Sequence, residues 1–153
     1  MRTIAIGPLY NEGERAVEVV RKFPPNQVDE VVIVNDASTD GSPEKAARAG
    51  ATVISLKKRS GCGVAIRTGI DYGLKKGYDV FIIFAANGKD NPEEIPRLLR
   101  PILESGADFV QGSRYLRGGH SENMPFHRIF GTHAYSFLFS LFLGKTITDG
   151  TNG

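Results

Sequence analysis

The sequence predicts an α/β fold in which a mostly parallel sheet is flanked by helices. Short apolar runs alternate along the chain with segments of helical period, which is the order of successive β-α-β units. The runs are apolar on both faces rather than at alternate positions, as expected for parallel strands that helices cover on both sides. Crossovers in such a sheet are right-handed, so the fold class also fixes how consecutive strands are connected.

Each element is predicted from its local pattern. Strands are predicted at residues 4–6, 31–34, 52–54, 80–84 and 108–110. Helices are predicted between them, at residues 12–23, 42–49, 63–76 and 92–104. The last helix has the clearest start, because Asn91 can cap it and Pro92 suits its first turn. The acids Glu93 and Glu94 then face the positive end of the helix dipole.

The composition is that of a globular protein, and we predict a single domain over residues 1–153. Hydrophobic residues make up 41% of the chain and charged residues 24%, which excludes the disordered and collagen-like classes. The single cysteine, Cys62, excludes an internal disulfide framework and fits a reducing compartment. A net charge of +2 is too weak and too scattered for nucleic acid to be an expected partner.

The chain shows no targeting pattern at its start and no segment that could cross a membrane. The first apolar run is interrupted at once by Gly7 and Pro8, so no signal-peptide apolar region is predicted there. The most apolar stretch, residues 137–143, is far shorter than the roughly 20 residues that a bilayer requires. We therefore expect a cytoplasmic protein.

Polar, charged and glycine residues concentrate directly after the predicted strands. These segments are residues 7–12, 35–41, 57–61, 85–90 and 112–114, and the opposite strand ends are plainer. In open α/β sheets, ligands bind beyond the carboxyl ends of the strands. The sequence therefore predicts a ligand site at this edge of the sheet.

The segment after the second predicted strand places an acid, Asp36, at the strand tip. Such an acid can accept hydrogen bonds from a ribose or a base edge, and the alternative is that residues 35–41 form only a turn and a helix cap. The sequence contains no G-x-G-x-x-G after the first strand and no G-x-x-x-x-G-K-[ST], which excludes the usual dinucleotide and P-loop cradles. No motif supplies Cys62 with a base, so we interpret it as a packing or loop residue.

Taken as a set, these segments resemble the nucleotide-sugar domain of glycosyltransferase family 2, which has the GT-A (Rossmann-like) fold. The resemblance is closest to the polyprenyl- and dolichyl-phosphate sugar transferases. It rests on Tyr10-Asn11-Glu12, on residues 34–41, 61–69 and 91–96, on Gly112-Ser113-Arg114-Tyr115, and on residues 149–153, which resemble the start of a late D-x-x-x-G-F-R segment. It implies an inverting hexosyltransferase that moves a sugar from a UDP- or GDP-linked donor to an acceptor, plausibly a polyprenyl phosphate, in glycan or cell-envelope biosynthesis.

The resemblance also implies which residues bind the donor. Pro8, Tyr10 and Glu12 would line the nucleotide pocket, and Asp36 would contact the base or the ribose. Substrate binding is also assigned to Arg67 and Asn87, each of which lies in a matched segment or loop.

Three further residues are implied at the phosphates and the acceptor. Arg114 matches a position that reaches the phosphates or the acceptor, with a solvated surface arginine as the alternative, and Arg128 is a candidate second cation. Cations there would stabilise the negative charge that grows on the leaving diphosphate. Asp149 is the candidate acid or base on the acceptor side, although a phosphate acceptor is already ionised and needs no strong base.

The chain departs from the family at the metal-binding D-x-D position, which reads Ala85-Ala86-Asn87. Mg²⁺ or Mn²⁺ is the implied cofactor, but hard cations favour carboxylates over an amide oxygen. Three outcomes stay open. Asp90 could supply the missing carboxylate beside Asn87, Lys89 could replace part of the metal charge together with Arg114, or catalysis could be lost.

The second departure is at the end, since Gly153 falls inside the late motif and implies a C-terminally truncated domain. Before it, residues 124–144 predict an apolar helix whose apolar surface exceeds one stripe. This helix either lies near the acceptor at the inner face of the membrane, as a peripheral contact, or packs on other parts of the protein.

Two other functions are alternatives to the glycosyltransferase. A sugar-nucleotide nucleotidyltransferase normally needs a glycine-rich loop with Arg and Lys after the first strand, which Pro8-Leu9-Tyr10 does not provide. A catalytically silent protein that binds nucleotide sugars is favoured by Ala85. Only the enzyme predicts turnover.

Overall fold

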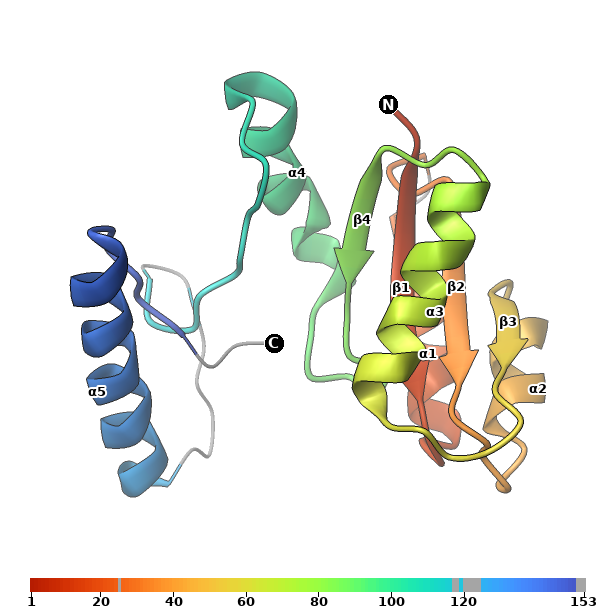
Figure 1. The fold of residues 1–153 in the computed structure, drawn as a ribbon. Helices are drawn as coiled ribbons and strands as arrows, with labels where there is room; N and C mark the ends of the chain where they lie inside the picture. Colours follow the sequence, from red (N-terminus) through yellow and green to blue (C-terminus); the bar gives the residue numbers. More distant parts are fainter. Residues whose placement is uncertain (25, 117–118, 120–124, 151–153) are drawn as a thin grey trace. The chain divides into compact units, whose positions relative to one another are not determined.

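In the computed structural model the chain divides into two compact units, residues 1–96 and 97–153 (Figure 1). The structure describes residues 1–24, 26–116, 119 and 125–150. Helix α4 (Ile95–Ser105) begins at the end of the first unit and continues into the second. Whether the two units form the single domain expected from the sequence stays a prediction.

The first unit is a parallel sheet with helices on both faces. Its strands are β1 (Thr3–Leu9), β2 (Glu30–Asn35), β3 (Thr52–Ser55) and β4 (Val80–Ile83), in the order β3-β2-β1-β4. Its helices are α1 (Glu14–Arg21), α2 (Ser42–Arg48) and α3 (Cys62–Lys75), followed by the short 3₁₀ helix η1 (Pro92–Glu94). The predicted α/β class, four of the predicted strands and the helices between them are confirmed.

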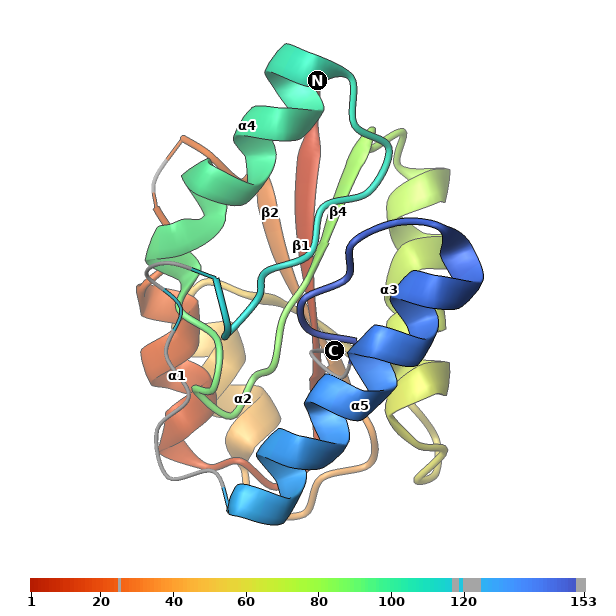
Figure 2. The ribbon, with the colours of Figure 1, turned by 90° about the vertical axis from the view of Figure 1, so that its left-hand side faces the viewer.

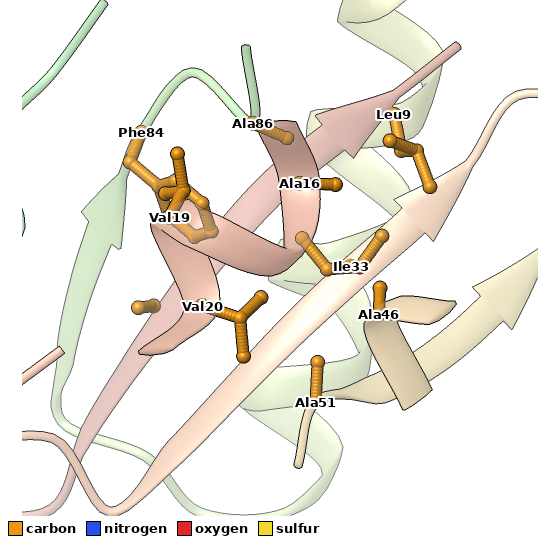
Figure 3. Packing of buried hydrophobic residues seen from close by; sticks show 10 residues of the cluster. Leu9, Ala16, Val19, Val20, Ile33, Ala46, Ala51, Phe84 and Ala86 are labelled. Atoms are coloured by element: carbon orange, nitrogen blue, oxygen red, sulfur yellow. The ribbon is translucent and has the colours of Figure 1, made fainter. Parts of the chain in front are cut away.

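Successive residues of each strand pack on opposite faces of the sheet. Helices α1 and α2 cover one face and α3 covers the other (Figure 2). On the first face, Leu9 and Ile33 pack with Ala16 and Val19 of α1 in one buried cluster (Figure 3). Helices thus bury the central residues of β1 and β2 from both faces, which explains why these runs are apolar throughout, whereas Ile83 of β4 is 45% exposed.

The opposite face has its own buried cluster, and α3 approaches it closely. Ile4, Ile6 and Val34 are fully buried there and pack with Ala65 of α3. A Cβ atom added at Gly69 of α3 would collide with the side chain of Ile6. A glycine at this position therefore lets α3 lie directly against β1, at a distance that a larger residue would increase.

The strand order creates a switch point between β1 and β4. The chain steps outward from β1 to β2 and β3, and then returns to pair β4 with the other side of β1. Ligands of open α/β sheets bind beyond the carboxyl ends of the strands at such a point. Pro8 fits this geometry: the ladder to β4 ends at the pair Ile6–Ile83, so the N–H that proline lacks is not needed by a neighbouring strand.

The predicted strand at residues 108–110 is wrong. The segment is irregular, it pairs with no strand in the described part of the chain, and Phe109 is 79% exposed. Three residues supply few ladder hydrogen bonds, and a short apolar run becomes a strand only where the fold provides a partner. The edge of the sheet therefore presents four strand ends rather than the predicted five.

In the second unit, residues 126–143 form α5 (Phe126–Leu143), which begins after Pro125 and ends at Gly144 with a positive φ of 63°. Its large apolar side chains are mostly exposed, among them Phe126, Phe137 and Phe142, whereas Thr132 and Ser136 are buried. Residue 124 lies outside the described residues. None of the helices that the structure describes combines the length and apolar character required to span a membrane.

A hydrogen-bonded cluster stabilises the edge of the sheet opposite the carboxyl ends. The Glu30 carboxylate accepts hydrogen bonds from Thr52 Oγ1 (2.7 Å), Tyr72 Oη (2.8 Å) and Tyr78 Oη (2.6 Å). Burial alone would raise the pKa of Glu30, but these hydrogen bonds lower it below its usual value. Burial, together with the bond to Glu30, raises the pKa of Tyr78 to about 12.

We expect Tyr78→Phe to lower the free energy of unfolding by about 1.5–3 kcal/mol at pH 8, because a hydrogen bond to a charged group is lost. The folded pKa of Tyr78 lies above its ordinary value of 10.0, so this contribution is complete below pH 10 and disappears as the pH rises toward 12. Urea unfolding of both proteins at pH 8 and near pH 12 measures the difference. A difference that is independent of pH would contradict the assignment.

Candidate functional site

The loops that follow β1 and β2 are joined by side-chain hydrogen bonds. The Asn11 backbone N–H donates to Ser38 Oγ (3.1 Å), and Asn11 Oδ1 accepts from the Thr39 N–H (2.9 Å). Asn11 has a positive φ of 52°, a conformation that asparagine tolerates better than most residues. The two strand tips therefore form one continuous rim.

Asp40 adds a second tie between the same two loops. Its Oδ2 accepts from the Gly13 N–H (3.0 Å), and its Oδ1 accepts from the N–H (3.0 Å) and the hydroxyl (2.5 Å) of Ser42. The hydroxyl of Ser42 is the main cause that lowers the pKa of Asp40 below its usual value. The carboxylate thus fixes the start of α2 relative to the loop before α1.

Asp36 joins the third loop to this rim. Its side chain is buried, with the residue only 4% exposed, and its oxygens accept from the Ser60 N–H (2.6 Å) and the Gly61 N–H (2.8 Å). Its own N–H donates to the Leu9 carbonyl (2.8 Å) at the end of β1. Asp36 therefore connects β1, β2 and the loop before α3. Its predicted contact with a base or ribose stays a prediction beside this structural role.

Tyr10 lies at the tip of β1 and carries a cation on its ring. The residue is 38% exposed, and the Arg59 guanidinium lies 4.0 Å from the ring centroid. Pro8 and Glu12 are half-buried on either side of Tyr10 in the chain. The Glu12 carboxylate oxygen Oε2 lies 3.9 Å from Nη1 of Arg15. The predicted pocket residues Pro8, Tyr10 and Glu12 therefore lie at the carboxyl end of β1 and in the loop that follows it.

The loop after β4 is short of metal ligands. Asp90 Oδ2 accepts from the Ala85 N–H (2.7 Å), and Asn87 Oδ1 accepts from the Lys89 N–H (3.2 Å). No three His, Cys, Asp or Glu side chains in the described ranges are grouped so that they could hold a metal ion. One carboxylate and one amide oxygen, each already accepting a backbone hydrogen bond, do not fit the donor set of Mg²⁺ or Mn²⁺. Lys89 itself is exposed.

Arg67 is a predicted donor-binding residue that the structure places on the outer face of α3. Ala65, Gly69 and Gly73 are the buried residues of α3. Arg67 lies between two of them in sequence, about 200° around the helix from each, and is exposed on the outer face. Its contact with the donor stays a prediction.

The second unit contains a bidentate ion pair between Arg114 and Asp149. Arg114 Nε donates to Asp149 Oδ2 (2.7 Å) and Arg114 Nη2 to Asp149 Oδ1 (2.8 Å), and the Arg114 backbone N–H also donates to Oδ2 (3.2 Å). The Asp149 side chain is 1% exposed and that of Arg114 22%. The hydrogen bonds to Asp149 raise the pKa of Arg114 above its ordinary value. The pair therefore keeps the guanidinium charged and oriented.

Neighbouring hydrogen bonds support this pair. Thr148 Oγ1 donates to Ser113 Oγ (2.8 Å), and the Gly150 N–H donates to Ser136 Oγ of α5 (2.8 Å). Arg128 is also on α5, but its side chain lies outside the described residues. Tyr10, Asp36 and Asn87 belong to the first unit and Arg114 to the second, so a crevice shared by all four stays a prediction.

Sequence reasoning found the loops but missed the pairs. The stack of Arg59 on Tyr10 and the pair Arg114–Asp149 join residues that are far apart in the chain. The sequence did contain a partial signal for the rim. Asn11, Ser38 and Thr39 are residue types whose side chains often form hydrogen bonds with the backbone of loops. No local signal indicated that Arg114 and Asp149, each predicted to contact substrate, would contact each other.

A double-mutant cycle tests the ion pair. For Arg114→Ala, Asp149→Ala and the double variant, we expect a coupling energy of about 1–3 kcal/mol in urea unfolding, because the carboxylate is buried. The exposed pair Arg100–Glu104, at 2.8 Å in α4, is the matched control, with an expected coupling of about 0.5 kcal/mol or less. Equal coupling at both pairs would contradict a structural role for Asp149.

Comparison with known proteins identifies the family. The sequence matches glycosyl transferase family 2 over residues 5–153. It is 33% identical to the polyprenol monophosphomannose synthase of Mycolicibacterium smegmatis, over 99% of this chain and 60% of that protein. It is 35% identical to the undecaprenyl-phosphate mannosyltransferase of Micrococcus luteus, over 100% of this chain and 65% of that protein. The chain therefore spans less than two thirds of the length of these relatives.

A solved structure supports the fold. Glucosyl-3-phosphoglycerate synthase from Mycobacterium tuberculosis, solved with Mn²⁺, UDP and glucosyl-3-phosphoglycerate, matches with a TM-score of 0.54 and 25% identity. The match covers 67% of this chain and 40% of that one. The GT-A type α/β fold predicted from the sequence is confirmed. With the family match extending over nearly the whole sequence, the chain belongs to glycosyltransferase family 2.

Proposed function

We propose that this chain contains the donor-binding part of an inverting glycosyltransferase that moves a hexose from a nucleoside diphosphate sugar to a polyprenyl phosphate. The observation that carries the proposal is the rim at the switch point, where hydrogen bonds join three loops beside β1. Two relatives, a polyprenol monophosphomannose synthase and an undecaprenyl-phosphate mannosyltransferase, support a polyprenyl phosphate as the acceptor. The M. tuberculosis synthase, which was solved with UDP, supports the donor class.

In this proposal the first unit holds the nucleotide. Pro8, Tyr10 and Glu12 line the pocket for the base and ribose, and Asp36 fixes the surrounding loops and lies at the base or ribose. UDP and GDP both remain candidates. The loop after β4, with Asn87 and Lys89, lies at the same edge and faces the diphosphate, because β4 pairs with β1 in parallel.

The transfer itself is a displacement at the anomeric carbon. An oxygen of the acceptor phosphate forms the new bond as the bond to the donor diphosphate breaks, which inverts the configuration. The acceptor is ionised at neutral pH, so the step needs no general base. This agrees with an Asp149 that accepts three hydrogen bonds from Arg114. Arg114, held in its charged form, would stabilise the leaving diphosphate or position the acceptor phosphate.

The location and the metal are also proposals. The enzyme would act in the cytoplasm at the inner face of the membrane, where the exposed apolar residues of α5 meet the lipid interface. The M. tuberculosis synthase was solved with Mn²⁺. In this chain the residues at the corresponding loop do not fit a divalent ion, and Lys89 would supply part of the positive charge.

A silent nucleotide-sugar-binding protein is the second candidate. It is favoured by a specific observation, namely that Ala85, Ala86 and Asn87 replace the carboxylates of the D-x-D position. Both candidates predict nucleotide binding, and only the first predicts transfer.

Transfer of sugar is measured by incubating the protein with UDP- and GDP-hexoses and polyprenyl phosphate in detergent, with Mg²⁺ or with EDTA. We expect transfer from one donor class, and a loss of about tenfold or more with Lys89→Ala, because a cation beside the diphosphate is removed. A rate that EDTA leaves nearly unchanged would agree with Lys89 replacing the metal charge. Complete loss in EDTA would instead assign that charge to a metal held with Asp90.

Thermal unfolding with UDP and with GDP is the control for binding. A nucleotide that binds the folded protein raises its melting temperature, and the stabilisation is about 2.7 kcal/mol at a concentration of one hundred times Kd. A shift without transfer under any condition would favour the silent protein. No shift with either nucleotide would contradict both functions.

A further inference from the structure

We propose that Arg59 binds the diphosphate of the donor nucleotide as a fixed cation at the tip of β1. This role rests on the proposed function, and it adds a residue to which the family resemblance gave no role and which the strand-end pattern included only within residues 57–61.

The loop that carries Arg59 is tied to the tip of β2 at both ends. At its start, the Leu56 N–H donates to the Asn35 carbonyl (2.9 Å). At its end, the Ser60 and Gly61 N–H groups donate to the buried Asp36 carboxylate. Only residues 57–59 therefore project from the rim, and Arg59 is the residue directly before the anchored end.

Arg59 is held at the switch point by its stack on Tyr10. The guanidinium carbon lies 4.0 Å from the ring centroid, and Tyr10 directly follows β1, the strand at which the sheet order reverses. A guanidinium held over an aromatic ring is attracted to the ring face and keeps its five N–H donors for other partners. Arg59 makes no hydrogen bond or ion pair with any residue in the ranges that the structure describes. An oriented cation with uncommitted donors suits a bidentate contact to a phosphate.

A cation at this position would add to the positive charge that Lys89 is proposed to supply. A donor diphosphate brings negative charge to an edge where Ala85-Ala86-Asn87 provides no carboxylate pair for a divalent ion. Lys57 and Lys58 are in the same loop and are exposed, but neither lies over an aromatic ring in the part of the chain that the structure describes. Arg59 therefore carries the same charge as Lys57 and Lys58 but is the one of the three that is held on Tyr10. A lysine of the same loop can therefore serve as the control in a binding experiment.

Calorimetric titration with UDP, GDP, the corresponding nucleosides and pyrophosphate tests the proposal in the wild-type protein and in Arg59→Gln, Arg59→Lys and Lys57→Gln. Lys57→Gln is the matched control, because it removes the same charge from the same loop. We expect Arg59→Gln to weaken binding of the preferred nucleoside diphosphate by about ten- to a hundredfold, as for a lost charged hydrogen bond. Arg59→Lys should recover part of the affinity, and Lys57→Gln should change it by less than about threefold.

The nucleosides and pyrophosphate separate the possible sources of an effect. A loss that is seen with the diphosphate and not with the nucleoside supports a contact to phosphate. An equal loss with the nucleoside would overturn the proposal, because Arg59 would then act through the Tyr10 ring. Equal effects of Arg59→Gln and Lys57→Gln would also overturn the proposal for Arg59. The proposed function would still stand in that case, as long as the wild-type protein binds a nucleotide. Wild-type protein that binds pyrophosphate as tightly as either nucleotide would reduce the site to an anion site.

Discussion

The buried carboxylate of Asp36 is the interaction on which the candidate site depends. Asp36 is 4% exposed, and a buried carboxylate is stable only if hydrogen bonds replace its lost hydration, as the N–H groups of Ser60 and Gly61 do here. The same residue donates its own N–H to Leu9 of β1. Two strand tips and a third loop are thereby fixed at one point, and the positions of Tyr10 and Arg59 follow from it. The resulting rim lies where the strand order reverses, which is where open α/β sheets bind ligands.

The elements of the first unit could be predicted because their patterns are local. Runs such as residues 31–34 are apolar throughout, and the structure buries them between helices on both faces. The run at residues 108–110 has a similar pattern but no partner strand in the described part of the chain, and pairing cannot be read from three residues. The length of β1 was underestimated for a related reason. Pro8 interrupts the sequence pattern, yet its missing N–H falls where β1 has no neighbour on the β4 side.

The sequence predicts which loops form the candidate site, but it does not predict which side chains in those loops contact one another. Strand ends located Tyr10, Asp36 and Asn87, and the family resemblance suggested their roles. The stack of Arg59 on Tyr10 and the ion pair Arg114–Asp149 depend on how distant segments fold together, which residue type and spacing do not encode. The pair gives Asp149 a structural role, because its carboxylate orients the Arg114 guanidinium, and its role as an acid or base on the acceptor side stays a prediction. Ala85 and Ala86 are evident from the sequence alone, and the hydrogen bonds of Asn87 and Asp90 show how the loop folds without a carboxylate pair.

The central claim is that nucleotide binds at the carboxyl edge of the sheet, on the rim that Asp36 organises. Amide chemical shifts recorded by ¹⁵N NMR during titration with UDP and GDP test it directly. The account predicts that one nucleotide shifts the amides of residues 10–13, 36–38, 59–61 and 87–90 together, with a common Kd. Shifts concentrated instead around Glu30, Tyr72 and Tyr78, at the opposite edge, would contradict it.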